Sequence, residues 1–438
     1  MEISTESLSR AAYCGMLYAA LPLLVPYGVI KAGRRGQPWP DLARRLGWGL
    51  GKLGAARRDG VWIHGVSYGE IGVARRLAAR VQDAHLGPVV LSATTATGLT
   101  LARSSREVEA VLPFPLDYPF AVRRFFAAVR PRALVLVEAE VWPNLLAFAR
   151  REGVPVALVN GRVTDRSFAG YTRFHALFAP AYAGLSLVAV REEVDAERAR
   201  RLGARPERVL VTGDLKFDLP PPVSTAEEVR AELRLGPSRL WIAGSTVDGE
   251  EEAVLSAHRA ALRVAPSLVL VLAPRHPERF EAVAAAVRGQ GLALARRSRK
   301  ETPVPGGVLL LDTLGELREA YVAADFAFVG GSLVARGGHN VIEPAAAGVG
   351  VLSGSHTLNF AGVVTALVDA GGLVVVRGGE ELKQQVTGLA GDRERAIAMG
   401  VAAKTAVERN RGALDRTLRA LLPLLSAASS LPRARRCP

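Results

Sequence analysis

A carboxylate that could perform acid–base chemistry stands close to two glycines in the first part of this sequence. The segment HGVSYGE (64–70) passes through Gly65 and Gly69 and ends at Glu70. Glycines at such a position allow a tight turn and let a ligand approach backbone amides. A carboxylate there can act as a general base, and it can equally be a first-turn residue stabilised by the helix dipole. Both roles remain open for Glu70.

Three other segments offer charge at the ends of apolar runs. Glu138 follows the run ALVLV, where a carboxylate either faces a ligand or forms a structural ion pair. Arg162 and Arg166 can bind an anionic group or form ordinary surface salt bridges. Lys216 can neutralise a phosphate or a carboxylate, or remain a solvated lysine.

The second half of the chain carries groups suited to a nucleotide. Gly244 and Ser245 lead from an apolar run toward a helix and offer backbone and hydroxyl donors for a phosphate. The acidic residues that follow them serve equally well as charges at a helix start. Glu343 comes shortly after a glycine-rich stretch, where a carboxylate is well placed to accept hydrogen bonds from ribose hydroxyls. Together with Arg275 and His276, these residues indicate a nucleotide pocket.

The elements that must position these groups follow a regular alternation. Short apolar runs are separated by longer amphipathic stretches, a pattern that predicts parallel strands with crossover helices. The first set of runs lies at 61–65, 88–95, 133–140, 154–160, 185–190 and 208–213. The second set lies at 241–246, 268–274, 307–312, 325–331 and 350–354. We therefore expect an α/β protein with two doubly wound Rossmann-like domains facing a central cleft, and ligands at the carboxyl ends of the strands.

The N-terminal region predicts membrane attachment. The segment from residue 11 to residue 30 contains no charged residue. Its length is about what a helix needs to cross a ~30 Å hydrocarbon layer. Lys31, Arg34 and Arg35 follow directly, and this basic flank predicts that the rest of the chain faces the cytoplasm. Because prolines within the run would kink a straight span, a helix lying in the membrane interface is the alternative.

Composition narrows the class of partner. The 438 residues carry a formal net charge of +14, which favours an anionic partner. Nucleic acid is not expected, because no aromatic platform or known motif is interleaved with the basic residues. The two cysteines, Cys14 and Cys437, lie at opposite ends of the chain and predict neither a disulfide nor a metal site.

In their order along the chain, these segments resemble the Kdo (3-deoxy-D-manno-octulosonic acid) transferases of lipopolysaccharide biosynthesis, which are glycosyltransferases of the GT-B type. The resemblance runs from the N-terminal apolar segment to about Phe360. It implies inverting transfer of Kdo from CMP-Kdo to a lipid A precursor, at the cytoplasmic side of the inner membrane and without a cofactor. It further implies that Glu70 is the general base and that Glu138 and Lys216 stabilise the transition state.

The residues expected to bind the CMP donor, from their segments or from the resemblance, are Gly244, Ser245, Arg275, His276, Gly315, Glu316, Leu317, Asn340, Val341, Ile342 and Glu343. Val66 and Tyr68 differ from the residues usual in the family, which bears on the acceptor pocket. The expected organisation is a membrane anchor at 1–30, an acceptor-binding domain at 31–215, a linker at 216–240, a CMP-sugar-binding domain at 241–425 and a basic tail at 426–438.

The expected chemistry needs no metal ion. A single phosphate requires less charge compensation than a diphosphate, and Lys216, Arg275 and a helix N-terminus can supply it. Two alternatives remain: a GT-B transferase that uses a UDP-sugar on a lipid acceptor, and a non-catalytic membrane-associated nucleotide-binding protein. The number of Kdo units transferred depends on the shape of the pocket, which the sequence leaves open.

Overall fold

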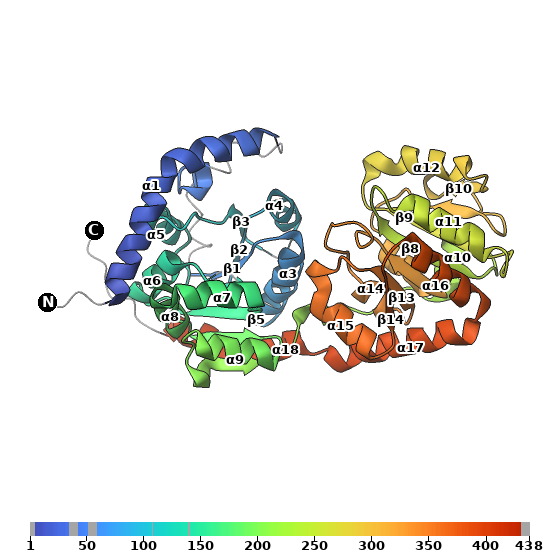
Figure 1. Cartoon of the computed structure of the whole chain (residues 1–438). Coiled ribbons are helices and arrows are strands. Elements are labelled where there is room, and N and C mark those ends of the chain that lie inside the picture. The colour runs from blue at the N-terminus through green and yellow to red at the C-terminus, as the bar shows by residue number, and fades with distance from the viewer. Residues whose placement is uncertain (1–4, 35–42, 51–58, 107, 139–140, 431–438) are drawn as a thin grey trace. The chain divides into compact units, whose positions relative to one another are not determined.

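The computed structural model describes residues 5–34, 43–50, 59–106, 108–138 and 141–430. These residues divide into two compact units, with boundaries between Leu215 and Lys216 and between Arg411 and Gly412 (Figure 1). The first unit contains the chain up to Leu215 together with the segment from Gly412 onward, and the second unit contains Lys216–Arg411. Arg35 of the predicted basic flank and the tail beyond residue 430 lie outside the described residues.

A parallel seven-stranded sheet forms the centre of the first unit, in the order β3-β2-β1-β4-β5-β6-β7. The six predicted runs all become strands, and a seventh strand, β3, is added at one edge. The strands are β1 (Val61–Gly65), β2 (Val89–Ala93), β3 (Ala110–Pro113), β4 (Ala133–Val137), β5 (Val156–Gly161), β6 (Leu187–Val190) and β7 (Val209–Val211).

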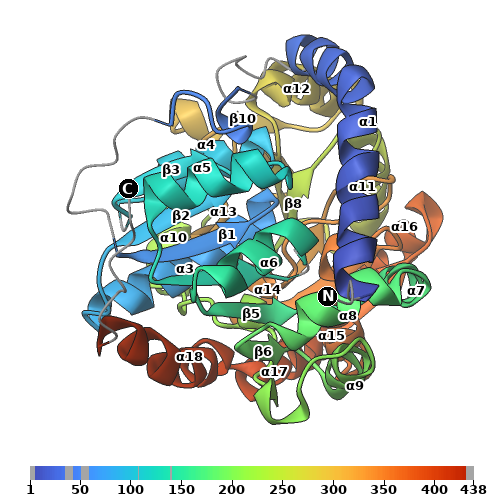
Figure 2. The ribbon, with the colours of Figure 1, turned by 90° about the vertical axis from the view of Figure 1, so that its left-hand side faces the viewer.

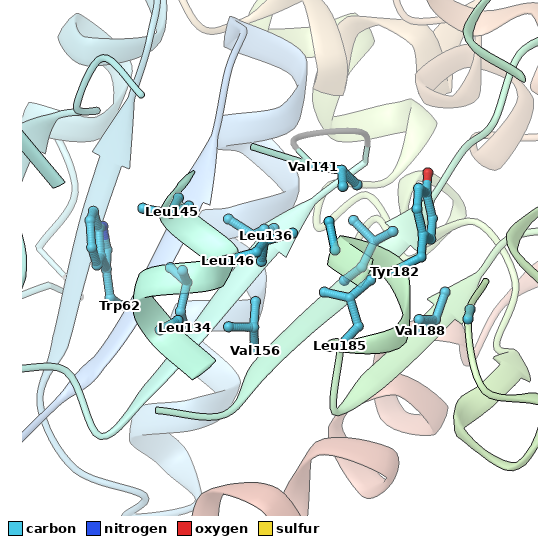
Figure 3. Close-up of a cluster of buried hydrophobic side chains, with 14 of the residues drawn as sticks. Trp62, Leu134, Leu136, Val141, Leu145, Leu146, Val156, Tyr182, Leu185 and Val188 are labelled. Carbon is cyan, nitrogen blue, oxygen red and sulfur yellow. The ribbon is translucent and has the colours of Figure 1, made fainter. Parts of the chain in front are cut away.

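Both faces of this sheet are covered, which explains why its strands are apolar at successive positions. Trp62 of β1 packs into a core with Leu134 and with Leu145 of α6 (Pro143–Arg151) (Figure 3). Helix α5 (Pro119–Val129) contributes Phe125 to the same core. Its neighbour Ile63 points to the other face, into a core with α3 (Tyr68–Asp83) and α4 (Ala96–Arg103).

The helix at the C-terminal end of the described chain also belongs to the first unit. Ala413, Leu421 and Leu425 of α18 (Ala413–Ser430) are fully buried in the same core as Ile63, and α18 contacts α3. Residues up to 425 were expected to belong to the second domain, whereas the segment from Gly412 onward belongs to the first unit. Packing, rather than chain continuity, therefore decides which unit this helix completes.

The N-terminal helix α1 (Thr5–Arg34) packs along the first unit, and Figure 2 shows one of its ends beside α8 (His175–Ala183). The Tyr13 hydroxyl donates to Asp117, and the Tyr118 hydroxyl donates to the Leu17 carbonyl. Met16 is 63% exposed on this helix. Within the described residues, no helix combines the length and the apolar character that crossing a membrane requires.

The second unit repeats the arrangement with the sheet order β10-β11-β9-β8-β12-β13-β14, again parallel throughout. Its strands are β8 (Leu240–Thr246), β9 (Val269–Pro274), β10 (Leu294–Arg296), β11 (Val308–Leu310), β12 (Phe326–Val329), β13 (Gly350–Gly354) and β14 (Leu373–Val376). Its helices are α10 (Ala226–Glu232), α11 (Glu251–Ala261), α12 (Phe280–Gly289), α13 (Leu317–Ala320), α14 (Ile342–Ala346), α15 (Ala361–Asp369), α16 (Gly379–Gly391) and α17 (Arg393–Asn410).

Part of the segment expected to be a linker is packed structure. Val229 of α10 is buried with Leu233 and Leu235 in the core of the second unit, against residues of β8 and β9. A capping box between Thr225 and Glu228 begins this helix.

Candidate active site at the carboxyl ends of two parallel sheets

The strand order of the first sheet reverses between β1 and β4. In doubly wound sheets, a crevice that binds ligands opens at the carboxyl ends of the two strands on either side of such a reversal. Glu70 follows β1 and Glu138 follows β4, and these two strands are paired. The topology therefore brings the two predicted catalytic carboxylates to one edge of one sheet.

Glu70 takes part in the N-terminal cap of α3. Its Oε2 accepts the backbone N–H of Val66 at 2.7 Å, and its Oε1 accepts the Ser67 hydroxyl at 2.8 Å. Ser67 is the N-cap residue, and its hydroxyl oxygen accepts the backbone N–H of Glu70. The side chain is half-buried. The helix-cap role that the sequence left open is thus present, and it fixes the direction of the carboxylate without excluding chemistry.

Glu138 stands at a strained backbone position. Its φ is 71°, and that of the neighbouring strand-end residue Asn160 is 52°, which is the left-handed region that non-glycine residues seldom adopt. Such strain is concentrated at functional sites in proteins. Asn160 is fully buried; its amide lies 3.5 Å from Oε1 of Glu138, and its Oδ1 accepts the backbone N–H of Leu215 at 2.9 Å. Sequence reasoning did not identify Asn160, because these partners are distant along the chain.

The two helices after β5 add positive charge and aromatic surface. Arg166 and Ser167 line a shallow pocket with Tyr171, Phe174 and Phe178, on helix α7 (Asp165–Arg173) and on α8 with its N-cap Phe174. Phe174 is exposed. A pocket lined by both a guanidinium group and aromatic rings suits an anionic amphiphile. Tyr68, which follows β1, is also exposed.

The second sheet reverses its order between β8 and β12, and the predicted donor residues gather around the same edge. Gly244 lies in β8 against the Tyr321 hydroxyl and Leu317, so closely that an added Cβ would lie 2.0 Å from that oxygen. Ser245 has a φ of 55°, another strained strand-end position. The backbone N–H of Arg275 donates to the Thr246 carbonyl, which joins the end of β9 to the end of β8.

Glu343 stands at the start of α14. Its carboxylate accepts the Asn340 side-chain amide at 3.0 Å, and Asn340 Oδ1 accepts the Ile342 backbone N–H. Burial raises the pKa of Glu343, while Asn340, Arg318 and Arg275 oppose that shift. Val341 and Ile342 are buried in the core. Only the polar members of this predicted set can therefore present hydrogen-bonding side chains to a ligand.

A histidine that the sequence analysis passed over belongs to the same group. Burial and the positive charges of Arg275 and His276 lower the pKa of His339 to about 4, so the ring is neutral at pH 7. His339 Nε2 is buried without a hydrogen-bond partner within the described residues. Its position next to Asn340 was visible in the sequence, but nothing there indicated its burial.

Two predicted residues are engaged with protein groups. The Glu316 carboxylate pairs with Arg297 Nε at 2.7 Å, and Arg297 also pairs with Glu232. Its neighbour Gly315 has a φ of 90°. Lys216 Nζ donates to the Asn359 carbonyl at 3.3 Å and lies 5.6 Å from the centre of the Phe360 ring.

The predicted residues are thus divided between the units: Glu70 and Glu138 belong to the first, and Lys216 and all the predicted donor residues belong to the second. In the described part of the chain, no group of three histidine, cysteine or acidic side chains is arranged to hold a metal ion.

Two doubly wound parallel sheets, each with polar groups at its point of strand-order reversal, define an α/β protein of the GT-B type. Solved structures of similar fold include a UDP-GlcNAc 2-epimerase from Neisseria meningitidis bound to UDP-GlcNAc (TM-score 0.55, 12% identity, covering 83% of this chain and 100% of that one). Another is MurG from Acinetobacter baumannii (TM-score 0.52, 16% identity, 83% and 99%). At these identities the likeness concerns the fold alone.

Sequence comparison gives the family. The family model described as 3-deoxy-D-manno-octulosonic-acid transferase (kdotransferase) matches residues 41–219. A 3-deoxy-D-manno-octulosonic acid transferase of Bordetella pertussis is 37% identical over 94% of this chain and 99% of its own length. The corresponding protein of Haemophilus influenzae is 33% identical over 95% and 99%. The chain belongs to the 3-deoxy-D-manno-octulosonic acid transferase family and is a glycosyltransferase, as the resemblance implied.

Proposed function

We propose that this protein transfers Kdo from CMP-Kdo to a lipid A precursor. The observation that carries the proposal is the match to transferases of this name over nearly the full length of both chains. The groups that such a reaction needs are present at the matching motifs, namely a carboxylate base, a second carboxylate and a set of nucleotide-binding side chains.

In the proposed reaction, an acceptor hydroxyl attacks the anomeric carbon of Kdo on the face opposite the leaving CMP. The new carbon–oxygen bond forms as the bond to the phosphate oxygen breaks, CMP leaves with the electron pair, and Glu70 takes the hydroxyl proton. The configuration at the anomeric carbon is therefore inverted. Each oxygen of a carboxylate has about two acceptor positions, so the bonds from Val66 and Ser67 still leave Glu70 able to take a proton. General-base help of this kind contributes about 10²–10⁴-fold to the rate.

Charge on the leaving phosphate is balanced by Arg275 and Lys216, and Glu343 accepts hydrogen bonds from the ribose hydroxyls. Glu138 and Lys216 act on the transition state. We assign no cofactor and no metal ion to the reaction. Activity should therefore survive dialysis against a chelator, whereas activity that is lost and then restored by added magnesium would contradict this assignment.

The acceptor reaches the protein at the cytoplasmic surface of the inner membrane. The supporting features are large exposed apolar side chains of α1, among them Leu8, Met16 and Tyr18, and the net charge of +14, which attracts anionic lipid headgroups. In this proposal α1 lies in the membrane interface, and the Arg166 pocket takes a phosphorylated, acylated part of the acceptor.

The test combines purified protein with CMP-Kdo and a tetraacylated lipid A precursor, followed by mass spectrometry of the lipid and assay of released CMP. Mass gain by one or more Kdo units with equal release of CMP is expected, and the product masses give the number of units. Transfer from a UDP-sugar in place of CMP-Kdo would overturn the proposal in favour of another GT-B reaction. Nucleotide binding without transfer to any lipid would favour a non-catalytic protein.

A further inference from the structure

One buried carboxylate joins two loops of the second unit. Glu250, which directly precedes α11, is fully buried and accepts four backbone N–H groups. Its Oε2 accepts from Val247 at 3.0 Å and from Gly331 at 2.8 Å. Its Oε1 accepts from Ser332 and Leu333, both at 2.9 Å. A charged acceptor with four donors in a buried place forms stronger hydrogen bonds than neutral groups do.

The two loops leave the two strands between which the sheet order reverses. Val247 follows β8, and the segment 331–333 follows β12, and these strands are paired. Glu250 therefore holds the crevice edges of β8 and β12 at a fixed separation, at the place where a doubly wound sheet binds its ligand.

Three of the four predicted groups of donor residues are linked to these loops by a backbone hydrogen bond; the group Gly315–Leu317 is the exception. Gly330 N–H donates to the Gly244 carbonyl, which joins the β12 loop to the Gly244-Ser245 segment. The N–H of Arg275 donates to the Thr246 carbonyl, next to Val247. The N–H of His339, next to Asn340, donates to the Gly330 carbonyl at 3.2 Å.

The backbone around the Glu250 carboxylate is tightly packed. A Cβ added at Gly330 would lie 2.6 Å from Glu250 Oε2 and equally close to the Ser245 carbonyl. The hydroxyl of Ser332 donates to the Val329 carbonyl and accepts the Gly354 N–H, which extends the same network to β13. A change in the carboxylate is therefore transmitted to the strand-end loops instead of being absorbed locally.

The same geometry limits how the loop can bind a donor. Backbone amides of a glycine-rich loop commonly bind phosphate. Here the backbone N–H groups of residues 331–333 already donate to the carboxylate of Glu250, so they are not open to a phosphate. The donor phosphate must instead be bound by side chains or by other amides. Arg275 therefore contributes more to phosphate binding than it would beside a free glycine-rich loop.

We propose that Glu250 is a positioning residue of the donor site: its carboxylate, which touches no substrate, fixes the β8 and β12 loops so that the side chains on them converge on CMP. This inference rests on the proposed function, since it presumes a nucleotide at this edge of the sheet.

The test is Glu250→Gln in the full-length chain. This change keeps the shape of the side chain but turns one oxygen, with its two N–H partners, into an NH₂ group that cannot accept from them. Calorimetry with CMP should show affinity lowered by roughly tenfold or more, which corresponds to about 1.4 kcal/mol. The KM for CMP-Kdo should rise while the KM for the lipid acceptor stays near wild type.

Asp325→Asn provides a matched control. Asp325 Oδ2 accepts the Leu240 N–H at 2.8 Å and so joins the same two strands, β12 and β8, at their amino ends. Glu250→Gln loses a buried carboxylate beside this sheet, and Asp325→Asn loses a half-buried one. All measurements are made well below the lower of the two variants' melting temperatures. Weakened CMP binding in Glu250→Gln alone supports positioning, whereas equal weakening in both variants shows a general structural effect and overturns it.

Wild-type protein separates the remaining outcomes. Absence of CMP binding by wild type would contradict the proposed function, and this inference with it. Normal CMP affinity in folded Glu250→Gln would overturn the inference alone. If Glu250→Gln does not fold, Glu250→Asp, which keeps the charge but is too short for all four amides, takes its place. Failure of both variants to fold, with Asp325→Asn folded, would make Glu250 a purely structural residue.

Discussion

Glu70 takes part in a helix cap and is also the proposed general base. The two roles require different properties of its side chain. As a cap it needs acceptor oxygens for Val66 and Ser67, whereas as a base it needs a carboxylate that can bind a proton. A substitution that removes proton affinity but keeps the shape therefore separates them.

We expect Glu70→Gln to lower turnover by roughly 10²-fold or more, because the amide cannot accept the proton of the acceptor hydroxyl. CMP affinity should not change, since the residue is assigned to proton transfer and not to the nucleotide. The measurement is single-turnover transfer, with calorimetry and thermal melting on the same preparation.

Ser67→Ala is the matched control for that variant. It removes the hydroxyl that accepts the Glu70 N–H, which should cost about 1 kcal/mol of stability with turnover largely retained. Near-normal turnover in Glu70→Gln, with a stability loss like that of Ser67→Ala, would leave only the helix cap.

In the donor group, Arg275→Ala and Glu343→Ala should each weaken CMP binding while the fold is retained, because one would pair with phosphate and the other with ribose hydroxyls. The measurement is calorimetric titration with CMP. Tyr321→Phe is a useful comparison, because it keeps the ring beside Gly244 and removes only the hydroxyl. Unchanged affinity in both alanine variants would contradict the assignment.

At the scale of elements, α1 has two faces with different tasks. Leu17 packs against the core cluster of Leu46, Tyr118 and Ala121, while the adjacent Met16 is 63% exposed. The first face attaches the helix to its unit, and the second is the face that contacts lipid in the proposed function.

We expect Met16→Asp to reduce cosedimentation with anionic vesicles without a change in melting temperature, because it places a charge in the proposed membrane-facing side. Leu17→Asp should lower the melting temperature instead, since it buries that charge against Tyr118. Vesicle binding by Met16→Asp equal to that of wild type would argue against this role of α1.

Elements were also the level at which the sequence was most informative. Buried parallel strands are apolar at consecutive positions, so runs such as VWIHG and LVLVLAP could be found without a structure. Short edge strands such as β3 and β10 carry less signal. The unit to which α18 belongs is decided by its contact with α3. No local sequence pattern indicates that contact.

Glu250 shows the same limit within the candidate site. Its acidic segment was interpreted as charge at a helix start, whereas three of its four partners lie 81 to 83 residues away. Residues that follow strands could be predicted as site candidates, because strand ends are visible in sequence. Residues that hold those loops together could not, because their partners are set by the order of the strands in the sheet.

Across the whole molecule, three histidines make the free energy of unfolding depend on pH: His64 and His258, which are fully buried, and His339, which is half-buried. Burial lowers the pKa of His64 to about 3 and those of His258 and His339 to about 4, from an ordinary 6.5. Between these values the unfolded chain binds more protons than the native chain, so these histidines lower stability as pH falls from 6.5 toward 4. Burial raises the pKa of carboxylates such as Glu343, whose contribution has the opposite sign.

The prediction therefore concerns a difference between two proteins. His258 Nδ1 accepts the Trp241 indole N–H at 3.2 Å, and its Nε2 lies 3.2 Å from the Gly306 carbonyl, an arrangement that requires a neutral ring. The free energy of unfolding of His258→Gln should fall less steeply between pH 6.5 and 4 than that of wild type. Denaturant titrations across this range give both slopes, and His85→Gln, at an exposed position, is the control. Parallel slopes for wild type and His258→Gln would contradict the prediction.

The return of the chain to the first unit at Gly412 has a consequence for synthesis on the ribosome. Helix α18 covers part of the face of the first sheet that carries Ile63 and α3, yet it is translated after the entire second unit. A nascent chain that ends before Gly412 holds all seven strands of the first sheet but leaves that apolar face incomplete. The second unit can therefore complete its core while the first still exposes the apolar surface that α18 later covers, so that the first unit, although it begins at the N-terminus, is completed last.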